Sequence, residues 1–141
     1  MAKCRRYIVG LVWAGLLAAP TVATAQPLLI EVEGGSAAFL VDRDAGRAFW
    51  LLDTCKRSLS IRQTTDDVFE SAELRDDVTL GPNRVELRQR FRFDLGTEPT
   101  RVEVFNSVRG GWAPVPVRVA QTCHPAAPCR QRTERPECPG G

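Results

Sequence analysis

The sequence predicts an all-β protein: a small antiparallel β-sandwich or partly open barrel, followed by a disulfide-tethered, proline-rich C-terminal tail. Apolar and polar side chains alternate with a period of two over residues 84–95, as they do in a half-buried strand. Turn-forming residues separate several other short apolar segments. Prolines and cysteines then replace this pattern near the C-terminus. We expect six to eight strands within residues 26–120 and an irregular tail over residues 121–141.

The first 25 residues predict a secretory signal peptide. Lys3, Arg5 and Arg6 form a basic start, an apolar stretch covers residues 7–19, and small residues follow at 23–25. A retained membrane anchor is the alternative, but this stretch reaches only about 20 Å into a hydrocarbon core about 30 Å thick. We therefore expect cleavage after Ala25 and a periplasmic or secreted protein that is not integral to the membrane.

Removing the signal peptide changes the charge and the cysteine count. Of 141 residues, 25 leave and 116 remain, with 16 basic against 17 acidic residues, a net charge of −1. Without a net positive charge, long-range attraction to phosphate is absent, so nucleic acid is not an expected partner. Arginine outnumbers lysine 17 to 2 in the full chain, a composition that suits a GC-rich genome.

The four cysteines that remain predict two disulfides, because exported chains meet oxidising compartments. These cysteines are Cys55, Cys123, Cys129 and Cys138. Three pairings are possible. We favour Cys55–Cys123 with Cys129–Cys138, because the first would tie the tail to the domain and the second would close a short loop.

The N-terminal half predicts short strands in succession. Residues 28–33 form an apolar-polar segment that ends in Gly34-Gly35. Residues 38–41 and 47–52 flank Asp-Arg-Asp-Ala-Gly, which predicts a β-hairpin with Gly46 at a positive φ. Leu59 and Ile61 alternate with polar residues and extend the sheet.

Residues 64–75 admit two interpretations of equal weight. Thr64 and Asp67 have the spacing of a capping box, and Val68, Phe69 and Ala72 can share one face of a short helix. The alternative is an acidic surface loop.

The alternation over residues 84–95 predicts a half-buried antiparallel strand, which pairs with residues 101–105 across a turn. Complementary charges select one register. Its pairs are Asp94 with Arg101, Phe93 with Val102, Arg92 with Glu103, Phe91 with Val104 and Arg90 with Phe105. Each contact contributes only about 0.2–1 kcal/mol, but a slip by one residue would expose both phenylalanines.

Residues 112–119 predict a return strand in which Pro114 and Pro116 alternate with valines. Because proline has no N–H to donate, we expect this strand at a sheet edge, with the prolines facing away from the ladder.

The sequence contains few groupings that suit catalysis, and it leaves open whether the protein is an enzyme. The only histidine, His124, lies in the tail, and there is no nucleophile elbow or phosphate-binding glycine loop. Nothing indicates a cofactor. Cys123, His124, Cys129 and Cys138 could bind zinc or serve thiol-redox chemistry, although their spacing lacks a Cys-x-x-Cys pair.

The remaining functional candidate is the arginine-rich strand. We take as candidate binding residues Arg84, Arg88, Arg90, Arg92 and Trp112. Arginines on one sheet face can bind an acidic protein or another anionic surface, whereas an ordinary salt-bridged sheet face is the plainer interpretation. The sequence favours a non-enzymatic envelope protein that binds a protein partner or anionic surface through this face or a sheet edge. The alternative is a metal-binding or thiol-redox accessory protein that uses the tail.

Overall fold

The computed structural model describes residues 15, 26–123, 129 and 134–139 of the chain. The signal-peptide prediction lies almost wholly outside the described residues, as does His124. The described part is all-β and contains ten strands. They are β1 (Leu28–Val32), β2 (Ala38–Asp42), β3 (Arg47–Leu51), β4 (Lys56–Thr65), β5 (Val68–Ser71), β6 (Leu74–Leu80), β7 (Asn83–Asp94), β8 (Arg101–Asn106), β9 (Trp112–Val115) and β10 (Val117–Thr122).

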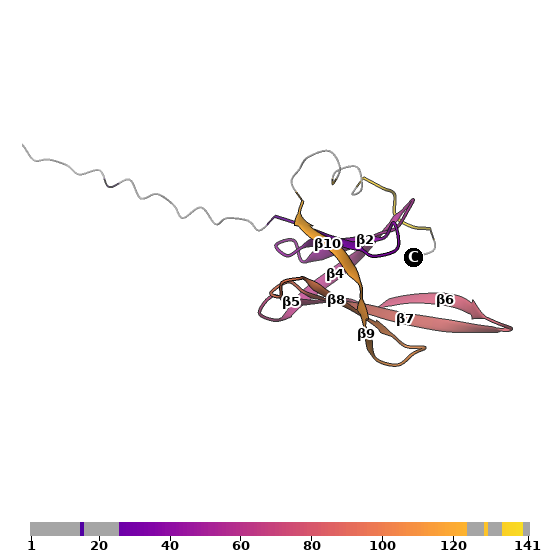
Figure 1. Cartoon of the computed structure of the whole chain (residues 1–141). Coiled ribbons are helices and arrows are strands. Elements are labelled where there is room, and N and C mark those ends of the chain that lie inside the picture. Colours follow the sequence, from indigo (N-terminus) through magenta and orange to yellow (C-terminus); the bar gives the residue numbers. More distant parts are fainter. Residues whose placement is uncertain (1–14, 16–25, 124–128, 130–133, 140–141) are drawn as a thin grey trace, which may run out of the picture.

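The strands form one antiparallel sheet in the order β10-β1-β2-β3-β4-β5-β7-β8-β9, with β6 paired to β7 beside this path. Figure 1 shows two layers: β2 and β10 lie in one, and β5 to β9 lie in the other. The long strand β4 joins them, because its first half pairs with β3 and its second half with β5. The sheet is thereby nearly closed into a barrel, as the sequence predicts.

Two predicted hairpins are confirmed. β2 and β3 pair from Ala38 with Leu51 to Asp42 with Arg47, and Gly46 has a φ of 62°. In that turn the Asp42 carboxylate accepts the N–H of Ala45 at 3.1 Å. The register of β7 and β8 is the one that complementary charges select, from Asp94 with Arg101 to Arg90 with Phe105.

Neither interpretation of residues 64–75 is correct, because this segment forms a hairpin of strands. β4 runs to Thr65, the chain turns through Asp66 and Asp67, and β5 begins at Val68. Asp67 has a φ of 61°, a left-handed conformation that aspartate tolerates better than most residues. The capping-box spacing is therefore a turn signal here. Phe69 and Ser71 are buried, the alternation expected of a strand.

The predicted return strand 112–119 divides at Pro116. β9 pairs only with β8, and β10 pairs only with β1, so both lie at the two ends of the sheet order. The edge position predicted from the prolines is confirmed. Pro116 cannot continue the ladder, but its carbonyl accepts the N–H of Glu33 at 2.9 Å, which holds the crossing between the two layers. This division, together with the strands β5 and β6 where the sequence predicts none, explains why ten strands form where six to eight are predicted.

The barrel interior holds the main hydrophobic core. Phe39, Phe91 and Phe93 pack with ring centroids 5.0 to 6.4 Å apart, and Trp50 contacts Phe91 at 5.1 Å. The buried members of this core are Ile30, Phe39, Val41, Ala48, Leu59, Ile61, Phe69, Phe91, Phe93 and Val102. The alternating side chains of β4, β5, β7 and β8 supply one face of this core.

A second cluster covers the opposite face of β1, β2 and β3. It contains Leu29, Ala38, Leu40, Leu51 and Cys123. The continuous apolar run of β2 reflects this burial on both faces, since a strand with one solvated face would alternate.

The favoured disulfide pairing is wrong. Cys55 bonds Cys138, and Cys123 bonds Cys129. The described part of the tail explains the first bond: Glu137 forms a parallel bridge with Lys56, and the N–H of Cys138 donates to the Lys56 carbonyl at 2.9 Å. These contacts place Cys138 beside Cys55, a neighbourhood that loop lengths alone could not indicate.

Candidate functional site

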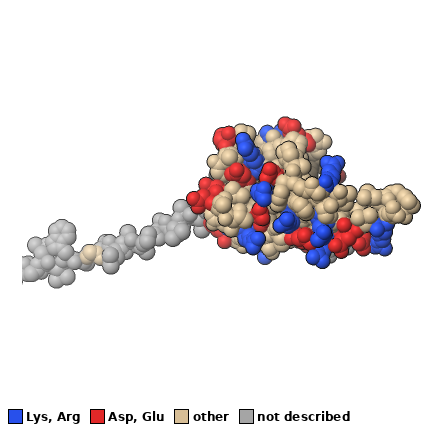
Figure 2. Space-filling view, turned by 90° about the horizontal axis from the view of Figure 1, so that it is seen from below, with Lys and Arg blue, Asp and Glu red and all other residues tan. Residues whose placement is uncertain are grey.

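The candidate site is the outer face of the layer that contains β5, β7, β8 and β9. Even-numbered residues of β7 point to this face, because odd-numbered Phe91 and Phe93 fill the core. Figure 2 views this side of the molecule and shows arginines and carboxylates interspersed across it. Opposite charges therefore alternate here rather than forming a surface of one sign.

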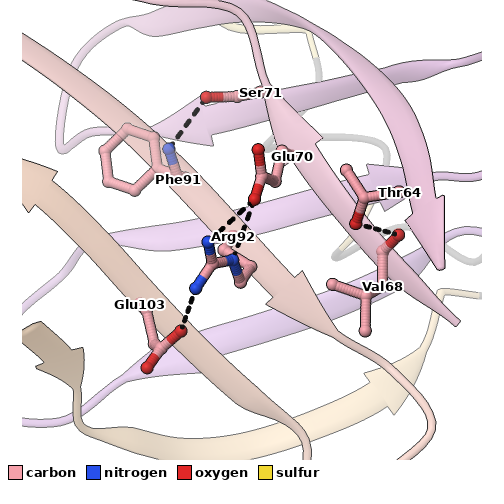
Figure 3. A network of polar contacts seen from close by, with 7 residues as sticks. All are labelled: Thr64, Val68, Glu70, Ser71, Phe91, Arg92 and Glu103. Atoms are coloured by element: carbon pink, nitrogen blue, oxygen red, sulfur yellow. Dashed lines mark hydrogen bonds and ion pairs between the residues drawn. The ribbon is translucent and has the colours of Figure 1, made fainter. Parts of the chain in front are cut away.

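Arg92 lies at the centre of a row of charges that crosses three strands (Figure 3). Its Nε and Nη2 atoms each lie 2.9 Å from one oxygen of Glu70 on β5, and its Nη1 donates to Glu103 on β8 at 3.1 Å. Partial burial alone would lower the pKa of Arg92, but the hydrogen bonds and charges of Glu70 and Glu103 raise that pKa above its ordinary value. The guanidinium is thus a fixed cation whose charge is already balanced.

Arg90 differs from Arg92, because aromatic rings surround it in place of carboxylates. Its Cζ lies 4.9 Å from the ring centre of Phe105 and 5.5 Å from that of Trp112. The Cζ of Arg92 also lies over the ring of Trp112, 3.9 Å from the ring centre. Within the described residues, no carboxylate forms an ion pair with Arg90, and its Nε is the one buried side-chain polar atom without a hydrogen-bond partner. Arg90 therefore keeps an uncompensated positive charge.

An open groove of about 370 Å³ lies beside Arg90, between β4, β5 and β7. Its lining is Ser60, Ile61, Arg62, Glu70, Ser71, Ala72, Glu73 and Arg90. Glu70 binds Arg92 and Glu73 binds Arg75, whereas the described structure gives Arg62 and Arg90 no carboxylate partner. The groove thus offers two uncompensated cations, which suits a ligand that carries carboxylates.

Ser71 lines this groove and links β5 to β7 by hydrogen bonds. Its hydroxyl accepts the N–H of Phe91 at 2.9 Å and donates to the carbonyl of Ala72 at 2.9 Å (Figure 3 shows the first contact). Only 6% of Ser71 is exposed, so these bonds satisfy a polar group inside the sheet. They hold β5 against β7 at the residue next to Arg90.

The structure brings together three of the five predicted binding residues. Arg90, Arg92 and Trp112 form one cluster, and Arg88 is exposed beside it on the same face of β7. Arg84 lies farther out and pairs with Asp77 at 3.0 Å on the exposed hairpin of β6 and β7. We therefore assign Arg84 to that hairpin and not to the site.

Sequence reasoning missed Arg62 and Glu70 on β4 and β5. Arg62 lies in a segment that the sequence does predict as a strand, but nothing there marks it as a binding residue. Glu70 lies within residues 64–75, for which the sequence predicts a helix or a loop, so no register places Glu70 opposite Arg92. The sequence does indicate Phe105 and Glu103 as neighbours of the site. The register selected by complementary charges pairs Phe105 with Arg90 and Glu103 with Arg92, as the structure does.

The tail cysteines are disulfide-bonded, so Cys123, Cys129 and Cys138 offer no thiolate to a metal in this oxidised form. Within the part of the chain that the structure describes, no group of three or more His, Cys, Asp and Glu side chains is placed to hold a metal ion. The same described residues include no helix of the length and apolarity that crossing a membrane requires. Two disulfides indicate an oxidising, extracytoplasmic environment.

Comparison with known proteins adds no relative. No protein-family model, curated protein sequence or solved structure matches this chain.

Proposed function

We propose that this chain is an exported, non-enzymatic binding protein of the periplasm or extracellular space, which binds an acidic segment of a partner protein at Arg90 and in the adjoining groove between β4, β5 and β7. The observation that carries this proposal is the environment of Arg90. Its guanidinium packs on Phe105 and Trp112 and lacks a carboxylate partner in the described structure. A cation held by aromatic rings is oriented before its ligand arrives, which lowers the entropy cost of binding.

The alternating charges favour a protein segment over a uniformly anionic surface. Glu70 and Glu103 flank Arg92 on the same face and would repel a surface of negative charge. A peptide that carries one or two carboxylates can place them on Arg90 and Arg62 in the groove, where the lining glutamates Glu70 and Glu73 are already paired with Arg92 and Arg75. Binding of this kind should weaken as salt is added, because both cations lie near solvent.

The sheet edge next to this face is less suited to the same ligand. An added strand needs N–H groups along the edge of β9. Pro114 lies within β9 opposite Glu103 and has no N–H to give. The face itself therefore supplies the binding groups.

Peptide display against the purified protein tests the proposal. We expect random peptides selected on the wild type to be enriched in Asp and Glu. Arg90→Met keeps the apolar stem on Phe105 but removes the charge, and it should weaken these peptides about tenfold to a hundredfold, the equivalent of one charged hydrogen bond.

Arg47→Met is the matched control, because Arg47 is an exposed arginine on β3, in the other layer. It should bind the selected peptides as the wild type does. The proposal fails if the selected peptides show no acidic excess, or if Arg90→Met binds them with unchanged affinity while its near-ultraviolet circular dichroism stays native.

A further inference from the structure

The hairpin of β6 and the first part of β7, residues 74–88, forms an arm that extends beyond the barrel (Figure 1). β7 pairs with β6 as far as Asn83, but its pairs with β8 begin only at Gln89. Residues 83–87 therefore have a neighbouring strand on one side alone. Two strands without further support are marginally stable in water, and a sheet of three or more is much more stable.

The orientation of the backbone shows which groups this free edge presents. The carbonyl of Arg88 accepts the N–H of Ser107 at 3.0 Å, and the N–H of Arg88 donates to the Ser107 hydroxyl at 2.9 Å. Arg88 thus points its backbone toward the β8 side. Residues two apart in a strand point the same way, so Glu86 and Arg84 direct their N–H and C=O groups away from β6. No described strand pairs with them there.

The charges on the arm are incompletely matched. Glu86 lies directly opposite Asp77 across β6 and β7, and like charges in that position destabilise a sheet. Arg84 binds Asp77 at 3.0 Å, and among the described residues no cation forms an ion pair with Glu86. One further arginine beside Glu86 would balance the charges of Asp77, Arg84 and Glu86.

We propose that two copies of this chain pair through this edge of β7, antiparallel about Val85. In that register Arg84 of each copy lies opposite Glu86 of the other, with their free backbone groups in hydrogen-bonding positions. Each Glu86 then gains the cation that it lacks, and the two Val85 side chains meet on the other face. The two arms form a continuous four-stranded sheet, and the interface is isologous, as in most homodimers.

The other free edges match themselves less well. Self-pairing of β6 about Asp76 would set two aspartates opposite each other, and Pro114 removes a donor from β9. On β10, Arg118 is already ion-paired with Glu31 of β1, and the strand contains no acidic residue that could complement Arg118 of a second copy. Complementary charge therefore selects β7.

Sedimentation velocity of the oxidised protein, from micromolar to millimolar concentration, tests the dimer. We expect the wild type to shift from monomer to dimer over this series. Glu86→Arg should weaken the dimer at least tenfold, since the new guanidinium would face Arg84 of the second copy. The same change places a cation opposite Asp77 within its own arm, so the monomer should stay folded.

Asp44→Arg is the matched control, because it makes the same change of charge in the exposed β2–β3 turn. It should dimerise as the wild type does. Adding Arg84→Glu to Glu86→Arg exchanges the two charges and should restore the dimer. Val85→Cys should give a covalent dimer on mild oxidation, whereas Val78→Cys, opposite Val85 in the same arm, should give little.

The proposal is overturned if the wild type stays monomeric throughout the series, or if Glu86→Arg and Asp44→Arg alter association equally. It also fails if Val85→Cys crosslinks no faster than Val78→Cys. None of these outcomes bears on the acidic-peptide site, because Arg90 and its rings lie outside the arm.

Discussion

Removal of the Cys55–Cys138 disulfide should destabilise this protein far more than removal of Cys123–Cys129. The first bond closes a loop between residues 83 positions apart, which the chain-entropy model equates with about 4.5 kcal/mol of stability. The second joins residues 6 positions apart and corresponds to about 2.2 kcal/mol. The double variants Cys55→Ser/Cys138→Ser and Cys123→Ser/Cys129→Ser compare the two bonds directly.

Urea unfolding followed by tryptophan fluorescence measures both variants, because Trp50 packs against Phe91 in the core and becomes solvated on unfolding. We expect Cys55→Ser/Cys138→Ser to unfold with its midpoint at a lower urea concentration than Cys123→Ser/Cys129→Ser. Equal midpoints would refute the reasoning, since they would show that the disulfide closing the long loop stabilises the folded chain no more than the one closing the short loop.

A tryptic digest without reductant checks the pairing itself. Trypsin separates Cys55 in residues 48–56 from Cys138 in residues 133–141, and it leaves Cys123 and Cys129 together in residues 119–130. The structure predicts the first two peptides linked to each other and the third closed on itself. A product that links all three peptides would show that Cys55 pairs elsewhere.

Three further predictions concern the sheet that carries the site. Ser71→Ala should lower the free energy of unfolding by about 1–3 kcal/mol, because the N–H of Phe91 loses its acceptor, while Ser36→Ala in an exposed turn should change it little in the same urea titration. Phe93→Ala should cost about 3–5 kcal/mol and Phe105→Ala clearly less, because Phe93 is fully buried and Phe105 lies on the outer face; equal losses would contradict that assignment. Arg57 and Asp76 form an ion pair of 2.6 Å at the base of the arm. A double-mutant cycle of Arg57→Met and Asp76→Leu should give a coupling energy of about 0.5–3 kcal/mol. A value near zero would show that this ion pair does not form in solution.

The β7–β8 hairpin could be predicted from sequence because its information is local. One face of β7 is apolar and the other charged, so a slip of one residue would expose Phe91 and Phe93. The turn between the strands is short, which limits the registers available. The charges of Arg92 and Glu103 then distinguish the remaining ones.

The failed predictions depend on contacts that are distant in sequence. Val68 and Phe69 are compatible with a helix face until β7 lies beside them and buries Phe69. The disulfide pairing depends on the contact between Glu137 and Lys56, which are far apart along the chain. Loop entropy describes the unfolded chain, and it changes too slowly with length to select a pairing.

The difference between the two layers explains why the candidate site lies where it does. β2 has four buried residues in succession, so the layer that contains it is covered on both faces and its outer side joins the second hydrophobic cluster. β7 alternates, so its layer needs a cover on the inner face only. An open sheet face must hold its charges in place by ion pairs across strands, as Arg92 does with Glu70 and Glu103. Arg90 lies within that face with rings in place of carboxylates, and this missing ion pair makes it the residue at which a carboxylate ligand gains most.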